Sequence, residues 1–404
     1  MKLSEELQWR NLIQDTTYID KTALDRGSIK FYLGVDPSAD SMTIGNLAAI
    51  LLARRMMESG HQAYLLIGGA TGLIGDPDGK KDERNLKDRE TIEQNKRGIV
   101  RQFRRLFTDQ KFMIVDNYDW FKDINYVDFL RDIGKHVPMS QMLGRDFVKS
   151  RLGDDGSGIS YAEFSYVMIQ AYDFLHLNRH HGVELEICGA DQWGNSVAGV
   201  DLIRRIDGGE AHVMSMPLVV NKSTGRKFGK SEDGAIWLDE QKTSVYKFYQ
   251  FWLNLDDEGV IDYLKTYTML SKEEIEDIKA LHDTNPAARV AQKTLAKETT
   301  ILVHGQDRYQ SVQRVTNVLF GGRDFSSLNE DDLDVLAAEI PTVKLNQSLI
   351  ETLVSTKMVK SNGEARRLMT AGAVSIDGEK ITEDILIGEA CLIKKGKNGF
   401  ILAR

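Results

Sequence analysis

The chain has 404 residues, of which 42% are hydrophobic and 28% charged, and its formal net charge is −8. This composition is ordinary for a globular protein of two or three domains. The acidic balance excludes a global basic field for nucleic acid, so any such binding needs a local patch. Cys188 and Cys391 show no metal-ligand spacing or disulfide framework, which favours a reducing compartment. With no apolar signal core or membrane-length apolar run, we expect a cytoplasmic protein with no membrane contact.

The stretch 29–67 predicts a βαβ unit. Ile29–Val35 is short, apolar and aromatic, Leu47–Ser59 is helical in pattern, and Gln62–Ile67 is a second strand. The polar turn that starts at Asp36 lies at the carboxyl end of the first strand, where open α/β sheets bind ligands. Gly45 would let a ligand approach the start of the helix, and helix N-termini favour phosphate. A plain turn is the commoner identity of such a segment.

Helices and strands continue to alternate up to about residue 220, which favours a parallel sheet. The expected helices are Arg89–Phe107, Val127–Val137, Ser140–Leu152, Tyr161–Leu177 and Ser196–Asp207, and the expected strands are Lys111–Val115, Val183–Cys188 and Met214–Val220.

Two polar features within this region indicate a ligand site. Tyr166, Gln170 and Asp173 share one face of the helix expected at Tyr161–Leu177. A carboxylate on a core-facing stripe is costly unless it is paired, although this face could also simply meet solvent. The segment GADQWGN follows the strand Val183–Cys188 at its carboxyl end, which is again a ligand-binding position.

Two glycine-rich loops carry cations. Gly68–Lys81 reads GGATGLIGDPDGKK, and Asn221–Gly234 reads NKSTGRKFGKSEDG. Such loops can bring backbone N–H groups and ammonium groups to phosphates. Each could equally be a charged surface loop.

The last part of the chain changes in composition. Ser244 to about Phe320 is helical by pattern, and Arg323–Ile340 is an acidic boundary. Pro341–Arg404 carries ten Lys and Arg against seven Asp and Glu. Ser361–Thr370 is expected to start a helix, and Ala373–Ile381 is expected to form a strand-turn-strand. Together they suggest a small RNA-binding module, although a domain with a purely structural role is also possible from the sequence.

Six ordered motifs together resemble a known family. They are YLGVDPSADSMTIGN, GGATGLIGDP, EFSYVMIQAYDF, GADQWGN, KFGKS and SNGEARRLMTAGAVSIDGEKI. The chain resembles the bacterial-type tyrosyl-tRNA synthetases of class I, whose two signatures are usually written HIGH and KMSKS. The resemblance covers nearly the whole chain and implies an α/β fold with a Rossmann-like parallel-sheet catalytic domain. The implied domains are the catalytic domain at 1–220, a linker with the KFGKS loop at 221–246, an all-helical tRNA-contacting domain at 247–322, an acidic linker at 323–340 and a small α+β RNA-binding domain of the S-four type at 341–404.

The resemblance implies roles for individual residues. On the tyrosine side, Tyr32 and Asp173 would hold the hydroxyl, Asp76, Tyr166 and Gln170 the α-ammonium group, and Gln192 would lie by the carboxylate. On the nucleotide side, the implied residues are Asp36, Ser38, Gly45, Gly189 and Asp191, with Thr43 at the triphosphate, Asn46 at the nucleotide, and Lys80, Arg84, Lys227 and Lys230 on the departing pyrophosphate. Arg366 and Arg367 would contact tRNA.

The implied reaction joins tyrosine to tRNA(Tyr) through tyrosyl-adenylate. ATP would arrive with Mg²⁺, with no permanently bound cofactor and no dedicated metal site. The family also implies a homodimer, with Val127–Leu152 in the contact. No general base is needed, because a carboxylate is already ionised at neutral pH.

Three alternatives stay open. Thr43 and Asn46 stand where the first signature usually has histidines, so a catalytically weak paralogue that binds RNA is one. The tryptophan enzyme shares the fold, although the pair Tyr32 and Asp173 favours tyrosine. A nicotinamide dehydrogenase is disfavoured, because the chain lacks the G-x-G-x-x-G turn followed by an acidic residue.

Overall fold

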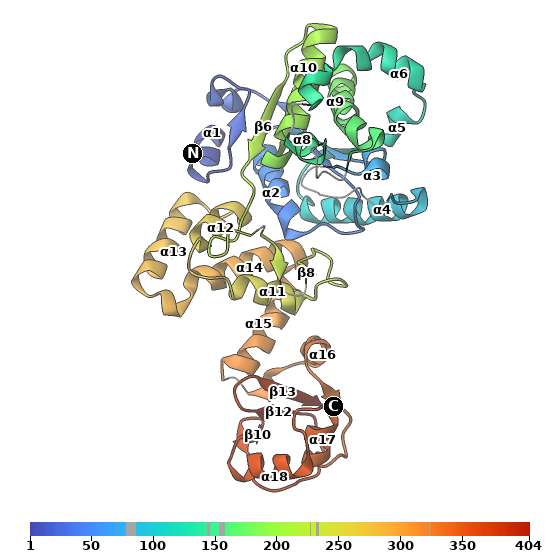
Figure 1. Cartoon of the computed structure of the whole chain (residues 1–404). Helices are drawn as coiled ribbons and strands as arrows, with labels where there is room; N and C mark the ends of the chain where they lie inside the picture. Colours follow the sequence, from blue (N-terminus) through green and yellow to red (C-terminus); the bar gives the residue numbers. More distant parts are fainter. Residues whose placement is uncertain (78–85, 144–145, 153–157, 227, 232–233, 323) are drawn as a thin grey trace. The chain divides into compact units, whose positions relative to one another are not determined.

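The computed structural model describes the chain except for residues 78–85, 144–145, 153–157, 227, 232–233 and 323. The chain forms two compact units, coloured along the sequence in Figure 1. The first unit comprises Met1–Thr243 and Trp252–Leu295, and the second comprises Ser244–Phe251 and Ala296–Arg404. The helical region expected as one domain at 247–322 is therefore divided between these two units.

The first unit is built on a six-stranded sheet in the described part of the chain, with the order β1-β6-β5-β2-β3-β4. All neighbouring strands are parallel except β1 and β6, which are antiparallel. The strands are β1 (Asp15–Thr16), β2 (Lys30–Val35), β3 (Gln62–Ile67), β4 (Phe112–Asp116), β5 (Leu185–Gly189) and β6 (His212–Met216). The predicted Rossmann-like sheet is confirmed. Strand β6 ends before Pro217, earlier than the expected Val220, because proline has no N–H to donate to the ladder.

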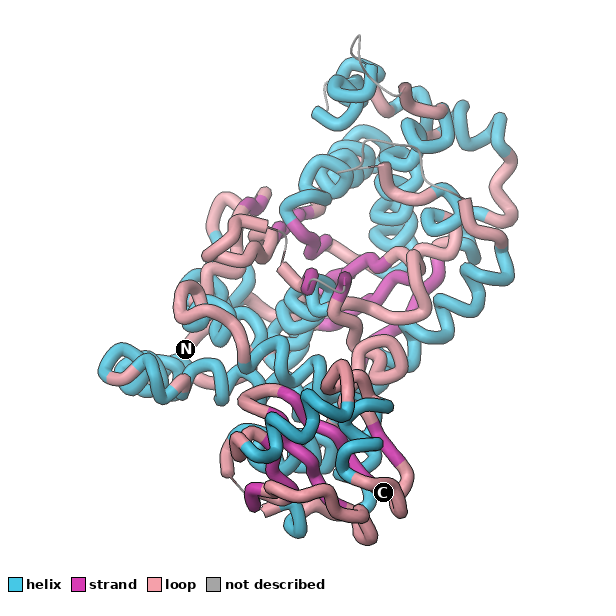
Figure 2. Tube along the Cα trace, turned by 60° about the horizontal axis from the view of Figure 1, so that its bottom comes forward, coloured by secondary structure: helices cyan, strands magenta, loops and turns pink. Residues whose placement is uncertain are grey.

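Helices flank these strands, as Figure 2 shows. The α-helices up to residue 207 are α1 (Leu3–Trp9), α2 (Ile44–Glu58), α3 (Thr71–Ile74), α4 (Arg89–Leu106), α5 (Tyr118–Phe121), α6 (Tyr126–Asp132), α7 (Met139–Leu143), α8 (Asp146–Leu152), α9 (Tyr161–His181) and α10 (Trp193–Asp207). Short 3₁₀ turns lie at η1 (Lys21–Asp25), η2 (Gly134–His136) and η3 (Ala190–Gln192). In the described ranges, no helix combines the length and apolar character needed to span a membrane.

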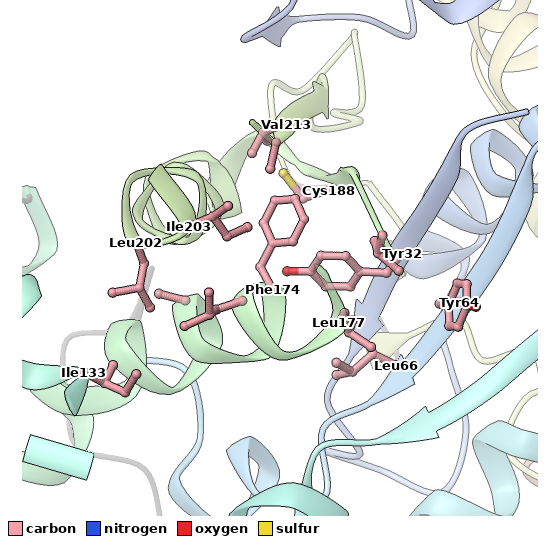
Figure 3. Close-up of a cluster of buried hydrophobic side chains, with 14 residues drawn as sticks. Tyr32, Tyr64, Leu66, Ile133, Phe174, Leu177, Cys188, Leu202, Ile203 and Val213 are labelled. Atoms are coloured by element: carbon pink, nitrogen blue, oxygen red, sulfur yellow. The ribbon is translucent and has the colours of Figure 1, made fainter. Parts of the chain in front are cut away.

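One buried cluster fixes helices α9 and α10 against the sheet. Tyr32 extends from β2 toward Phe174 of α9, with Cys188 of β5 beside them (Figure 3). The rings of Tyr32 and Phe174 meet edge-on, 5.2 Å between centroids. Leu202 and Ile203 of α10 complete this part of the core. The cluster holds α9 so that its polar residues face the strand tips.

The remaining elements of the first unit follow the sheet. They are β7 (Lys230–Ser231), β8 (Gly234–Ala235), α12 (Val260–Tyr267), α13 (Lys272–Thr284), η4 (Pro286–Ala288) and the first part of α14 (Val290–His304).

The second unit combines helices with a five-stranded sheet, counted over its described residues, in the order β11-β10-β12-β13-β9. Its helices are α11 (Val245–Leu253), α15 (Gln306–Phe320), η5 (Phe325–Ser327), α16 (Glu330–Glu339), α17 (Leu349–Ser355) and α18 (Asn362–Thr370), together with the end of α14. Its strands are β9 (Thr342–Val343), β10 (Val374–Ile376), β11 (Glu379–Lys380), β12 (Cys391–Lys395) and β13 (Gly399–Ala403). The expected small α+β domain is present.

The acidic segment expected as a linker at 323–340 contains a packed helix, α16, and that expectation needs correction. The side chain of Asn329 caps the helix by accepting from the Asp332 N–H at 2.9 Å. Asp332 is buried and accepts from Arg314 Nε at 2.7 Å, and Leu336 is fully buried. Leu333 and Leu336 lie at helical spacing, an apolar signal that the many carboxylates of this segment obscured.

Candidate active site

A cavity of about 450 Å³ opens at the carboxyl ends of β2 and β5, between the start of α2 and one face of α9. This is the ligand-binding edge of an open parallel sheet. Of the predicted site residues, it is lined by Tyr32, Asp36, Ser38, Thr43, Gly45, Asn46, Asp76, Tyr166, Gln170, Asp173, Gly189, Asp191 and Gln192. Lys80, Arg84 and Lys227 lie outside the described residues, and Lys230 is described by its backbone only, in β7. Arg366 and Arg367 are exposed on α18 of the second unit.

Asp173 is fixed at one end of the cavity, where it is 2% exposed. Its two carboxylate oxygens accept separate hydrogen bonds, from Asn117 Nδ2 at 3.0 Å and from Trp120 Nε1 at 2.9 Å. Burial nevertheless raises the pKa of Asp173 well above its usual value, and these two donors oppose that shift. Sequence reasoning missed Asn117 and Trp120, which follow β4 in the chain.

A second buried carboxyl, that of Glu186, lies at the same end of the cavity and was not predicted. Glu186 is 3% exposed and sits opposite Tyr32 on the neighbouring parallel strand. Gln170 Nε2 donates to Glu186 Oε1 at 3.2 Å. Burial raises the pKa of Glu186 to about 7. The sequence did contain a signal for this residue, because Glu186 is an ionisable residue in the strand VELEIC, which was expected to be buried.

The predicted ammonium-binding residues make separate hydrogen bonds along the wall of the cavity. Tyr166 Oη donates to Asp36 Oδ2 at 2.8 Å, and Thr71 Oγ1 donates to Asp36 Oδ1 at 2.6 Å. Gln192 Nε2 donates to Asp76 Oδ2 at 2.6 Å. Burial and the Asp36 charge raise the pKa of Tyr166, so its hydroxyl stays protonated. The wall thus offers carboxylates to a bound cation.

The two signature motifs meet beside the start of α2. Thr43 caps this helix, and Asn46 Oδ1 accepts from both the backbone N–H and the hydroxyl of Thr43, each at 3.0 Å. The Ile44 N–H donates to the Ile236 carbonyl at 3.1 Å, so the segment after the KFGKS loop lies along the first signature. Gly229, with a φ of 85°, packs so closely that a Cβ there would lie 2.7 Å from Ile44 Cγ1. Only glycine fits this contact.

An aromatic stack holds the base of this loop. Phe228 is buried and packs on Tyr263, with 4.5 Å between ring centroids, and on Tyr267 and Trp252. Phe228 also lines the cavity. The loop that carries Lys230 is therefore anchored next to the helix N-terminus, where anions are favoured.

Residues 24–321 match the family model of tRNA synthetases class I (W and Y). The structure is similar to that of the C-terminally truncated mitochondrial tyrosyl-tRNA synthetase of Aspergillus nidulans, at 29% identity and a TM-score of 0.71, covering 79% of this chain and 94% of that one. It also shares its fold with the tryptophanyl-tRNA synthetase of Plasmodium falciparum, at 14% identity and a TM-score of 0.55, over 82% of this chain and 89% of that one. The sheet and its cavity are those of a class I aminoacyl-tRNA synthetase.

Residues 332–403 match the model of the tyrosine–tRNA ligase SYY-like C-terminal domain. The chain is 40% identical to a tyrosine–tRNA ligase of Bacteroides thetaiotaomicron and 43% identical to one of Streptococcus agalactiae, in each case over 100% of this chain and 99% of the relative. The chain belongs to the tyrosine–tRNA ligase family.

Proposed function

We infer that this protein activates L-tyrosine with ATP and joins it to tRNA. The observation that carries the inference is a cavity that contains, in order, two buried carboxyl groups, an acidic wall and a helix N-terminus. Full-length relatives at 40% and 43% identity support the same activity and give no support to a catalytically weak RNA-binding paralogue. Incubating the protein with ATP, tyrosine and tRNA should yield tyrosyl-tRNA, and substitution of tryptophan for tyrosine should yield no charged tRNA.

We propose that the substrate tyrosine lies with its ring hydroxyl toward Asp173 and Tyr32. Its ammonium group then faces the acidic wall that contains Asp76 and Tyr166, and the unbonded Oε1 of Gln170 offers a further acceptor. This placement points the substrate carboxylate toward Gln192 and the nucleotide. Positioning of this kind can supply a large part of the catalysis, because it converts an encounter into an oriented attack.

ATP is proposed to place its phosphates at the start of α2. Ser38, Thr43, Gly45 and Asn46 line this part of the cavity, while Gly189 and Asp191 line the part assigned to the ribose. The tyrosine carboxylate attacks the α-phosphorus, and pyrophosphate departs with the electron pair of the broken P–O bond. Mg²⁺ would enter as the counter-ion of ATP. Lys80, Arg84, Lys227 and Lys230 are the proposed cations on the leaving group.

Thr43→His should preserve the activation rate or raise it, by up to about 10²-fold. Thr43 is only partly buried, and its backbone N–H holds Asn46 whatever the side chain, so the substitution removes only the hydroxyl bond to Asn46. A histidine could add one hydrogen bond to the triphosphate, and a bond to a charged group contributes about 1.5–3 kcal/mol. Single-turnover formation of tyrosyl-adenylate measures the effect. A large loss of rate with an unchanged melting temperature would show that the site requires threonine.

We propose that the second unit binds tRNA through Arg366 and Arg367. Both guanidinium groups are exposed on α18, in a segment whose cations outnumber its anions. The double variant Arg366→Ala/Arg367→Ala should lower kcat/KM for tRNA about tenfold and reduce the salt dependence of binding by about two charges. Pyrophosphate exchange should not change, because it involves no tRNA.

The full chain is the correct material for this test. A cut after Phe320 would expose Val315, Val318 and Leu319, which pack against Leu336 and Phe400 in the core of the second unit. Arg404→Ala is the matched control, because this exposed arginine is paired with Asp334, Nη1 to Oδ1 2.7 Å. Equal loss of tRNA charging in the control and the double variant would contradict the assignment.

A homodimer is also proposed. Large apolar side chains are exposed around the expected contact at Val127–Leu152, and clusters of this kind mark interfaces. They are Tyr126, Val127, Met139, Leu143, Leu152 and Tyr161. The free thiols of Cys188 and Cys391 are both buried and support a reducing, cytoplasmic setting.

A further inference from the structure

Three buried polar atoms on residues that line the cavity have no hydrogen-bond partner of good geometry among the described residues. They are Tyr32 Oη and Glu186 Oε2, on neighbouring strands and within electrostatic reach of each other, and Gln170 Oε1, which is assigned above to the ammonium group. Unpaired buried polar atoms cost free energy, so several in one place indicate that a polar ligand group completes them. Asp173, at the same end, has a donor on each oxygen. Glu186 is therefore the carboxyl with an oxygen left over, and the site residues assigned above give it no role.

The carboxyls of Glu186 and Asp173 influence the same groups. After burial itself, Glu186 is the largest cause of the raised pKa of Tyr32, and Asp173 contributes to the same shift. Glu186 also raises the pKa of Asp173. The groups that face Glu186 are Tyr32 from β2, Asp173 and Gln170 from α9, Ser196 from α10 and Cys188 from its own strand.

None of these neighbours can neutralise a second negative charge. Tyr32 and Cys188 have raised pKa values and stay protonated near neutral pH, while Gln170 and Ser196 carry no charge. Two carboxylates that share a dry site cannot both ionise easily, and their protons then leave in steps that belong to the pair. Their proximity and burial therefore favour a state in which the pair keeps a proton.

We propose that Glu186 is a specificity-determining residue for the ring end of the substrate. Together with Asp173 it holds one proton, so the substrate hydroxyl meets a carboxylate that accepts from it and a carboxylic acid, next to Tyr32, that donates to it. A phenol can donate once and accept as well, and this arrangement satisfies both capacities. Phenylalanine satisfies neither, and it leaves Tyr32 Oη and Glu186 Oε2 unpaired. The inference rests on the proposed use of tyrosine and extends it to a residue outside the predicted set.

The proposal gives the tyrosine preference a pH dependence of defined sign. As pH rises through the upper ionisation of the pair, the donating acid is lost and a second negative charge appears. Tyrosine binding should then weaken relative to phenylalanine binding, and the preference should be largest at the low end of the tested range, where the pair keeps its proton. The phenol of the substrate does not titrate in this range, because its pKa is about 10.

The test is equilibrium binding of tyrosine and phenylalanine to the full chain from pH 6 to 9, without ATP. Calorimetry gives the Kd of tyrosine, and displacement of tyrosine gives that of phenylalanine. In the ratio of the two constants, the pH dependence that comes from groups shared by both amino acids, such as the α-amino group, cancels. The ratio should fall about tenfold across this range, the size of one hydrogen bond. A flat ratio in the unaltered protein would overturn the proposal without any variant.

Glu186→Gln keeps a donor and the side-chain volume but cannot ionise, so its ratio should not depend on pH. Cys188→Ala is the matched control, since it alters the same strand and the same cavity wall without removing a carboxyl, and its ratio should fall as in the unaltered protein. A pH dependence that persists in Glu186→Gln would also overturn the proposal. Binding needs no catalysis, so a failure of tyrosine activation would count against the proposed function while the binding profile still tests Glu186.

Discussion

Replacing Asp173 with alanine should reduce the preference for tyrosine over phenylalanine by about 10³-fold or more. Sites that pair a substrate hydroxyl with buried groups reject the analogue without it by about 10⁴- to 10⁵-fold, a magnitude established for tyrosyl-tRNA synthetases themselves and adopted rather than deduced from this structure. Asp173 is the buried carboxyl held rigidly by Asn117 and Trp120 at the ring end of the cavity. Its loss removes the principal acceptor and leaves a hole. Competitive activation of the two amino acids measures the ratio.

The ratio of tyrosine to phenylalanine activation does not change when a variant simply loses folded or active protein, because both amino acids are measured on the same protein. Alanine at this position also leaves the N–H donors of Asn117 and Trp120 without an acceptor. Asp173→Asn is therefore a second variant, because asparagine has nearly the same size and keeps one acceptor oxygen. Tyr32→Phe is the graded comparison and should cost only about 0.5–1.5 kcal/mol of tyrosine binding, one neutral hydrogen bond. Unchanged discrimination in the Asp173 and Tyr32 variants would place the substrate hydroxyl elsewhere.

Lys230→Ala should lower the rate of tyrosyl-adenylate formation by about 10²-fold or more, with tyrosine affinity almost unchanged. The backbone of Lys230 lies in β7, directly after Gly229, which packs on the first residue of α2. A cation there would act on charge that develops on the departing pyrophosphate, and loss of one such group costs about 10²- to 10³-fold. The same result is expected for Lys227, a residue outside the described part of the chain. Pre-steady-state fluorescence or rapid-quench kinetics separates rate from affinity.

Lys222→Ala is the control for this experiment. Lys222 belongs to the same loop and carries the same charge, but its ammonium group pairs with Asp262 at 3.6 Å. Its removal should change the rate by less than about threefold, because exposed ion pairs contribute little. Loss of tyrosine binding in Lys230→Ala, or equal loss of rate in Lys222→Ala, would contradict a role in the transition state.

The elements with simple local signals could be predicted from the sequence. Strand β3 occupies the residues expected, Gln62–Ile67, and the turn of the strand-turn-strand expected at Ala373–Ile381 lies at Asp377 and Gly378, which both adopt positive φ. Helix α16 was harder to predict, because its many carboxylates concealed the buried Leu336 and the partly buried Leu333. The strand expected at Met214–Val220 was predicted with the wrong ends. The strand stops at Met216, because Pro217 has no N–H to donate to the neighbouring strand.

The site was predictable where a motif placed residues near strand tips. Tyr166, Gln170 and Asp173 face the cavity because they share one helical face. Glu186 could not be assigned in the same way, since its importance arises from its position opposite Tyr32 on an adjacent strand and from burial on both faces of a parallel sheet. Asn117 and Trp120 reach Asp173 from a distant part of the chain. Contacts of this kind depend on tertiary packing, which local patterns do not contain.

Tyrosine-dependent exchange of pyrophosphate into ATP tests the central claim most directly. The reaction needs the ring end, the acidic wall and the phosphate end of the cavity at once, and it needs no tRNA. The protein should incorporate labelled pyrophosphate into ATP when tyrosine is supplied, and at least about 10⁴-fold less efficiently with phenylalanine. Absence of exchange from folded protein that binds tyrosine, or equal exchange with tryptophan or phenylalanine, would contradict the assignment of this cavity as a tyrosine-activating site.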